Sequence, residues 1–328
     1  MSIFADALQP HLVRGLIALR GRINSPTLPD LITARSGVAY YLDFDDDEET
    51  VILDFRHNDP IANAIASDAS RFSCAAFQSM AALETEMLER DSVPWCMIKL
   101  YYSAFYAGHA LLRLLGESCS NFDRRHIDRL LALGQILEKT PSFGITTGTY
   151  RCAVDASGTI LTWSPARGGK GGPHQAFWGT FGDHLGKLSD AVLTGPLSRP
   201  SAITVADKID ALRRITSSNN AHFHHWLSVL RNEFQYRHGH GVWFPSSLRR
   251  HDREYLSRLC AAWTKDPDKI QVPSLGAGTL VQFVIACTLI VSLCRALLVR
   301  ISELSGPRSF VAYGPFSFLE SAGIFPNP

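Results

Sequence analysis

The sequence lacks an excess of charge of either sign, because 32 lysine and arginine residues face 31 aspartate and glutamate residues, for a formal net charge of +1. A dedicated duplex-DNA binder often carries a global basic field, and this composition excludes one. Wholesale disorder is not indicated either, since 46% of the residues are hydrophobic and 19% are charged. The 328 residues suffice for one large domain or two moderate ones, and any contact with nucleic acid must come from local patches.

A C-x-x-C pair is also missing, and the number of cysteines is odd. Several cysteines lie in apolar helical runs, so we predict buried free thiols in a reducing cytoplasm. Residues 1–6 contain neither a basic nor an apolar leader region, and we expect no signal peptide. The seven cysteines are Cys74, Cys96, Cys119, Cys152, Cys260, Cys287 and Cys294.

Long apolar runs are scarce, and the main one is residues 276–294, which carry no charge over 19 residues. The run contains Gln282, Thr288 and Ser292, and Arg295 follows it directly. A membrane-spanning helix needs about 20 clearly apolar residues. The run therefore predicts a buried core helix or a dimer-interface helix, with a membrane span as the alternative.

Several nucleotide-binding and hydrolase motifs are absent as well, and no internal repeat is found. The glycine-rich stretch 166–173 superficially resembles a phosphate loop, but Lys170 precedes Gly171 and Pro173 occupies the next turn. It is therefore interpreted as a flexible basic loop and not as an ATP site. The absence of a G-x-S-x-G elbow argues against an α/β-hydrolase.

Most of what is present has the apolar periodicity of helices. Residues 95–115 are hydrophobic nearly all round and should form a central helix. Asn121 or Asp123 can cap the helix that follows. The predicted helices cover residues 5–22, 61–90, 95–115, 123–138, 205–215, 221–238, 252–263 and 276–304.

Alternating patterns predict two β-hairpins, which are the only strands expected. The first pairs 38–44 with 50–55 around an acidic turn, interpreted as solvated and not as a metal site. The second pairs 147–154 with 159–163. We predict a mainly α fold, a helical bundle with small hairpin insertions and a mixed α/β N-terminal region. The expected domains are residues 1–86, residues 87–305 with an insertion at about 140–200, and an irregular tail at 306–328.

Candidate chemistry is concentrated in residues 231–238. On a continuous helix, Arg231 and His238 would return to nearly one azimuth about 10 Å apart along the axis. Arginine offers a charged fork for a phosphate, histidine titrates near neutrality, and Asn232 could orient either group. This set suits metal-free RNA cleavage. The alternatives are an Arg231–Glu233 ion pair, a polar helix residue at Asn232, and a histidine that complements the helix C-terminus.

Other polar groups could contact a substrate. One stripe on the central helix is either its solvent-facing edge or the wall of a phosphate cleft, and a basic cluster is either a solvated face or an RNA contact. Arg237 and His240 adjoin the motif and are interpreted as auxiliary or structural. The stripe is Lys99, Ser103, Tyr106, His109 and Arg113, and the cluster is Arg124, Arg125, His126 and Arg129.

A metal site is the competing interpretation of the histidines. His222 and His225 share a helix face, and His224, His238 and His240 lie nearby in the sequence. No carboxylate or thiolate stands at a standard zinc spacing. We therefore predict neither a metal nor a cofactor.

The run Arg231-Asn232 followed by His238 resembles the R-x4-6-H motif of the HEPN superfamily, and the aromatic- and alanine-rich residues 101–112 resemble a helix common in HEPN bundles. The resemblance spans about 87–305 except 140–200, and leaves the first 85 residues unexplained. It implies four or five bundled helices and a homodimer whose two motifs face each other.

The resemblance also implies a function. Active members are metal-independent endoribonucleases that leave a 2′,3′-cyclic phosphate, and many are toxins or effectors in bacterial defence against phage. Such a chain would be cytoplasmic and not bound to a membrane, and an antitoxin or defence protein would be its partner. The alternative is a catalytically inactive HEPN-like module that binds RNA, a nucleotide or a partner protein.

Overall fold

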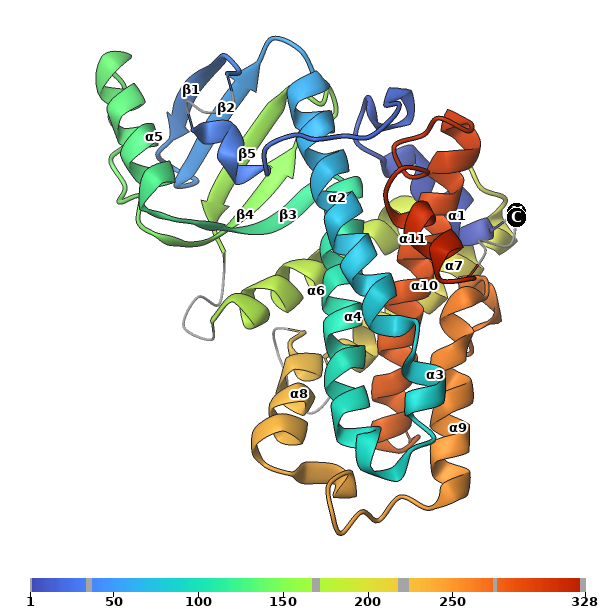
Figure 1. Ribbon diagram of the computed structural model, residues 1–328. Coiled ribbons are helices and arrows are strands. Elements are labelled where there is room, and N and C mark those ends of the chain that lie inside the picture. Colours follow the sequence, from blue (N-terminus) through green and yellow to red (C-terminus); the bar gives the residue numbers. More distant parts are fainter. Residues whose placement is uncertain (1, 34–36, 167–171, 218–223, 274–275, 325–328) are drawn as a thin grey trace.

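The computed structural model describes residues 2–33, 37–166, 172–217, 224–273 and 276–324. Helices predominate, and a five-stranded antiparallel sheet lies at one end of them (Figure 1). The mainly α prediction is therefore confirmed. The helices are α1 Ile3–Leu8, α2 Asp59–Met80, α3 Leu83–Glu86, α4 Val93–Leu114, α5 Arg124–Ile136, α6 Gly172–Leu193, α7 Arg199–Thr216, α8 Trp226–Tyr236, α9 Arg250–Ala261, α10 Thr279–Ser305 and α11 Pro315–Ser321.

The sheet has the order β1-β2-β5-β4-β3, and every pair of neighbours is antiparallel. Both predicted hairpins are present, and the register of Leu53 with Leu161 joins them into one sheet. Strand β3 was not predicted. It follows α4 directly, after a turn at Gly116, whose φ is +83°. The strands are β1 Tyr40–Asp45, β2 Thr50–Phe55, β3 Glu117–Phe122, β4 Gly148–Val154 and β5 Ile160–Pro165.

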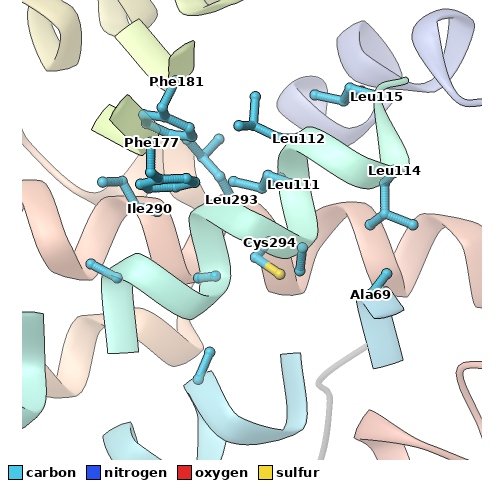
Figure 2. Packing of buried hydrophobic residues seen from close by; sticks show 14 of the residues in the cluster. Ala69, Leu111, Leu112, Leu114, Leu115, Phe177, Phe181, Ile290, Leu293 and Cys294 are labelled. Atoms are coloured by element: carbon cyan, nitrogen blue, oxygen red, sulfur yellow. The ribbon is translucent and has the colours of Figure 1, made fainter. Parts of the chain in front are cut away.

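Helix α4 is the centre of the molecule, as its all-round hydrophobicity predicts. It packs against α2 on one side and α10 on another, and α8 lies along its first half (Figure 1). Figure 2 shows Leu111 and Leu112 of α4 close to Phe177 and Phe181 of α6 and to residues of α10. Gly108 permits this approach, because a Cβ atom there would lie 2.8 Å from the Phe177 ring. The close fit places α6 beside α4.

Helix α10 matches the long apolar run, and it is the one described helix that is long and apolar enough to span a membrane. Of its most apolar window, 89% is buried inside the protein. Some of its polar groups bond inside the protein: Ser292 donates to the carbonyl of Lys265, and Arg295 donates to that of Thr264, whereas Nε of Arg295 is buried without a hydrogen-bond partner. The core-helix interpretation is confirmed, and six of the seven cysteines are buried free thiols, with Cys74 half-buried.

Several predicted elements were wrong in extent. The helix expected at 5–22 ends at Leu8, because Pro10 and a left-handed Gly15 (φ +95°) turn the chain into short 3-10 segments. Asp123, and not Asn121, caps α5 by accepting from the amides of Arg125 and His126. The tail contains the short helix α11, which packs on α2.

The expected domain boundaries do not coincide with gaps in the packing. Buried residues from Phe4 to Leu319 form one continuous hydrophobic cluster. Strand β2, from the N-terminal region, pairs with β5 from the expected insertion, and α2 packs along α4. Helix α6, which also belongs to the expected insertion, packs on α7 and contributes to the core. Residues 1–86 and 140–200 thus complete the fold around α4.

Candidate functional site

Arg231 lies on the side of α8 that packs against α4. Its Cζ atom is 5.3 Å from the ring centroid of Tyr101 and 5.9 Å from that of Tyr102. The residue is only 9% exposed. Its Nη1 atom donates to Oε1 of Gln235 at 3.2 Å, whereas its Nε atom is buried without a hydrogen-bond partner.

No Asp or Glu of the described residues forms an ion pair with Arg231. Glu233, the alternative partner expected from the sequence, instead lies with Oε2 2.6 Å from Nε2 of His240. A buried guanidinium without a counter-charge is costly, and a bound anion would relieve that cost. Arg231 is therefore a candidate anion-binding group.

Tyr101 connects Arg231 to α6. Its hydroxyl accepts a hydrogen bond from Nε1 of Trp178 at 3.0 Å and lies 2.9 Å from Nδ1 of His174. His174 comes from the first turn of α6, and its ring packs 4.5 Å from that of Phe105 on α4. We name Tyr101, Tyr102, His174, Arg231 and Gln235 the arginine site.

The electrostatics of this site keep His174 neutral. Burial, and secondly the positive charge of Arg231, lower the pKa of His174 to about 4. Burial also raises the pKa of Tyr101, so its phenol stays protonated. A neutral imidazole has two forms here: Nδ1 either accepts from Tyr101 or donates to it. The second form leaves the lone pair of Nε2 free to take a proton, as in the orientation of a catalytic histidine by a buried partner.

His238 does not share a helix face with Arg231, and this prediction was wrong. Helix α8 ends at Tyr236, and His238 has left-handed backbone angles (φ +51°, ψ +35°). Its exposed ring packs 5.1 Å from the Trp243 ring. The helix thus ends before Gly239, where the sequence predicted its end, and His238 is not part of the helix.

The other residues of the motif are at the surface. Asn232 is exposed on α8, and Arg237 is exposed just after the helix. His240 is held by Glu233, as described above, which favours the structural interpretation of that histidine. The orienting role expected of Asn232 has no contact to support it among the described residues.

Most of the polar stripe of α4 is buried inside the protein. Ser103 is buried and donates to the carbonyl of Ala76, and Arg113 is 4% exposed and lies 3.3 Å from Asp68 of α2. His109 is buried between the rings of Phe72 and Phe177. These groups stabilise the contact between α2 and α4, because a helix that is covered on all sides buries even its polar residues.

Lys99 and Tyr106 of the stripe remain partly exposed. Tyr106 and Arg113 line an open cavity of about 500 Å³, whereas Lys99 pairs with Glu86 at 2.6 Å. The exposed Arg124 and Arg125 pair with Asp128 and Asp123 of their own helix start. Substrate contacts by these residues stay predictions.

The metal interpretation finds no geometric support in what the structure describes. His222 lies outside the described residues, while His224 hydrogen-bonds Ser217. Across the described ranges, no three His, Cys, Asp or Glu side chains come together in a way that could hold a metal ion.

Sequence analysis missed His174, and it did not assign Tyr101, Tyr102 or Gln235 to the site either. His174 is 57 positions away from Arg231 in the chain and reaches it only because α6 and α8 both pack on α4. The sequence gives only a weak indication of His174: the aromatic pair Phe177 and Trp178 marks a buried face one turn later on the same helix.

Comparisons with protein-family models, with curated proteins and with solved structures find no match to this chain.

Proposed function

We propose that the chain is a metal-independent endoribonuclease whose phosphate-binding group is Arg231. The observation that carries this proposal is the buried Arg231 without a carboxylate partner, next to a neutral imidazole at His174. Its planar fork suits the two non-bridging oxygens of a phosphodiester. The resemblance of the Arg231 run to the HEPN motif supports the same substrate.

In the proposed reaction, the 2′-oxygen of RNA attacks the adjacent phosphorus while the bond to the 5′-oxygen breaks. His174 takes the proton of the 2′-hydroxyl, and Arg231 stabilises the charge that develops on the phosphorane. The leaving 5′-oxygen needs a proton from a second acid, for which His238 is the candidate. The products are a 2′,3′-cyclic phosphate and a 5′-hydroxyl end.

The proposal includes a homodimer in the cytoplasm and a role in bacterial defence against phage, with an antitoxin or defence protein as partner. These parts are supported by the HEPN resemblance. In such a dimer, the two exposed His238 side chains would each be available to a second copy of the arginine site. A symmetric pair of sites would then supply both an acid and a base.

Cleavage of total cellular RNA in excess EDTA tests the proposal. We expect the wild type to cut, Arg231→Met to lose at least about 100-fold in rate, and His174→Gln to lose about 100-fold or more. Arg199→Met and His251→Gln are matched controls, because both residues are exposed and far from the site in the sequence. His238→Ala separates the roles of the two histidines.

Two results would contradict the proposal. Equal cleavage by the wild type and Arg231→Met would remove the arginine site from the reaction. Binding of RNA that depends on Arg231, without cleavage by any protein, would favour the catalytically inactive binding module instead.

A further inference from the structure

A group of exposed aromatic rings lies beside the end of α8. Trp95, in the first turn of α4, is 58% exposed, and Phe244 is 84% exposed. The rings of Trp95 and Trp243 are 5.7 Å apart in an edge-to-face arrangement, and His238 packs on the other indole at 5.1 Å. We name Trp95, His238, Trp243 and Phe244 the aromatic end patch.

A hydrogen bond to the main chain of α8 holds one ring of the patch in place. Nε1 of Trp243 donates to the carbonyl of Phe234, the last buried residue of α8. That bond fixes the indole, while Trp95 is anchored by its position on the central helix. Large apolar rings that are both fixed and exposed are unusual on a protein surface without a binding role.

The patch continues the arginine site along the contact between α4 and α8. Trp95 and Tyr102 are seven residues apart on α4, so they share nearly one azimuth about 10 Å apart along the axis. Arg231 lies against Tyr102, and Trp243 lies against Trp95. A polymer whose phosphate is bound at Arg231 therefore reaches the aromatic end patch with its neighbouring units.

The charge beside the patch favours a polyanion. Arg237 is exposed next to His238, and none of the described carboxylates pairs with it. Arg237 therefore adds an accessible positive charge beside the rings, which suits the phosphate backbone of a nucleic acid.

We propose that the aromatic end patch binds unpaired bases of single-stranded RNA by stacking, while Arg231 binds the backbone. This inference rests on the proposed function and adds the substrate class to it. Stacking on aromatic side chains is available to bases that are not paired, and bases inside a duplex are not exposed in this way. The site thus selects single strands over duplexes.

The experiment measures fluorescence anisotropy of a labelled 2′-O-methyl RNA oligonucleotide, single-stranded or annealed to its complement. The 2′-O-methyl group removes the attacking hydroxyl, so binding is measured without cleavage. We expect the wild type to prefer the single strand and Trp95→Ala and Phe244→Ala to weaken that binding by about 10-fold each. Trp95→Phe should keep most of the affinity, and Tyr41→Ala is the control, since Tyr41 is an exposed ring on β1.

Unchanged single-strand affinity in both Trp95→Ala and Phe244→Ala would overturn the inference. So would a change of oligomeric state in Trp95→Ala by sedimentation velocity, because the patch would then be a protein interface. If the wild type binds the 2′-O-methyl strand through Trp95 but no natural RNA is cut, the proposed function fails and this inference stands. If cleavage requires Arg231 but neither alanine variant alters binding, only this inference fails.

Discussion

The guanidinium of Arg231 stacks against Tyr101, with 5.3 Å between Cζ and the ring centroid, and no carboxylate of the described residues neutralises it. Among the described residues it therefore belongs to no structural ion pair. Removing one partner of a buried ion pair typically costs about 3–5 kcal/mol, because a charge is left uncompensated. Replacing Arg231, a buried cation with no carboxylate partner in the described ranges, leaves no uncompensated charge in the protein.

We therefore predict that Arg231→Met changes the free energy of unfolding by no more than about 1 kcal/mol, although RNA cleavage is lost. Methionine fills the volume with a flexible apolar chain, and the lost contact with the aromatic rings is offset by the lost desolvation of the charge. Urea unfolding at pH 7 measures this. A loss above about 3 kcal/mol would show that Arg231 is mainly structural.

The imidazole of His174 should titrate far below an ordinary histidine. We predict a pKa near 4 by NMR in the wild type, because burial and the charge of Arg231 both lower it. In Arg231→Met the pKa should rise but stay below 6.5, since burial is the larger cause and remains. A normal pKa in the wild type would contradict this account.

The same depressed pKa predicts how stability depends on pH. The unfolded chain binds more protons than the folded chain between pH 4 and 6.5, so stability from His174 is present above about pH 6.5 and is lost as the pH falls towards 4. His174→Gln should flatten the stability curve in that window. The acid limb of the cleavage profile should likewise lie near pH 4 in the free enzyme.

Local signals in the sequence were sufficient for much of the fold. The periodicity of α4, α5 and α10 and the turns of both hairpins depend on neighbours in the chain, and these elements were predicted. Strand β3 was not, because Glu117, Ser118 and Ser120 have no apolar alternation, and the strand exists through its pairing with β4. Burial of these polar residues is a tertiary effect.

Helix α6 was missed for a related reason. Gly182 and Gly186 weaken its helical pattern, since glycine costs about 1 kcal/mol in a helix interior. In the structure a Cβ atom at Gly182 would lie 2.1 Å from the ring of His224, and one at Gly186 would lie 3.1 Å from Arg213. These two glycines weaken the helical pattern in the sequence, but the folded protein needs them because His224 and Arg213 lie so close to α6. His174 stayed hidden with this helix, so only the Arg231 half of the site was predicted.

Asp68 of α2 and Arg113 of α4 form a buried ion pair that crosses the boundary expected at residue 86. We predict that Asp68→Leu lowers the free energy of unfolding by about 3–5 kcal/mol, because Arg113 is left buried without its counter-charge. The double variant Asp68→Leu with Arg113→Met should recover the part of that loss that comes from the unpaired Arg113, whereas the bonds of Asp68 with the Leu28 amide and with Arg71 stay lost. Glu254→Ala, which breaks the exposed pair with Arg250, is the control and should cost less than about 1 kcal/mol.

A double-mutant cycle by urea unfolding measures the coupling between the two residues. Strictly additive losses would mean that the two charges do not interact. Strong coupling would instead show that this ion pair stabilises the contact between the N-terminal region and the central helix.

Glu117, at the start of β3, is a buried carboxyl group whose pKa is depressed in the folded protein. Burial would raise the pKa of this carboxyl, but hydrogen bonds and charges from His184 and Arg151 outweigh burial and lower the pKa to about 2. Arg151 donates two hydrogen bonds to Glu117 through Nη2, at 2.9 and 2.8 Å, and Lys187 of α6 donates to Oε1 of the same carboxylate at 3.1 Å. The ionised carboxylate therefore stabilises the contact between the sheet and α6.

A carboxyl with a depressed folded pKa contributes stability that is present above its unfolded value of about 4.5 and is lost as the pH falls through about 2. Glu117→Gln should therefore lower the free energy of unfolding by about 3 kcal/mol at pH 7. The difference from the wild type should shrink steadily between pH 4.5 and pH 2. Urea unfolding of both proteins at pH 7, 5 and 3 measures it, and a difference that does not vary with pH would mean that glutamine perturbs packing and that the charge of Glu117 contributes nothing.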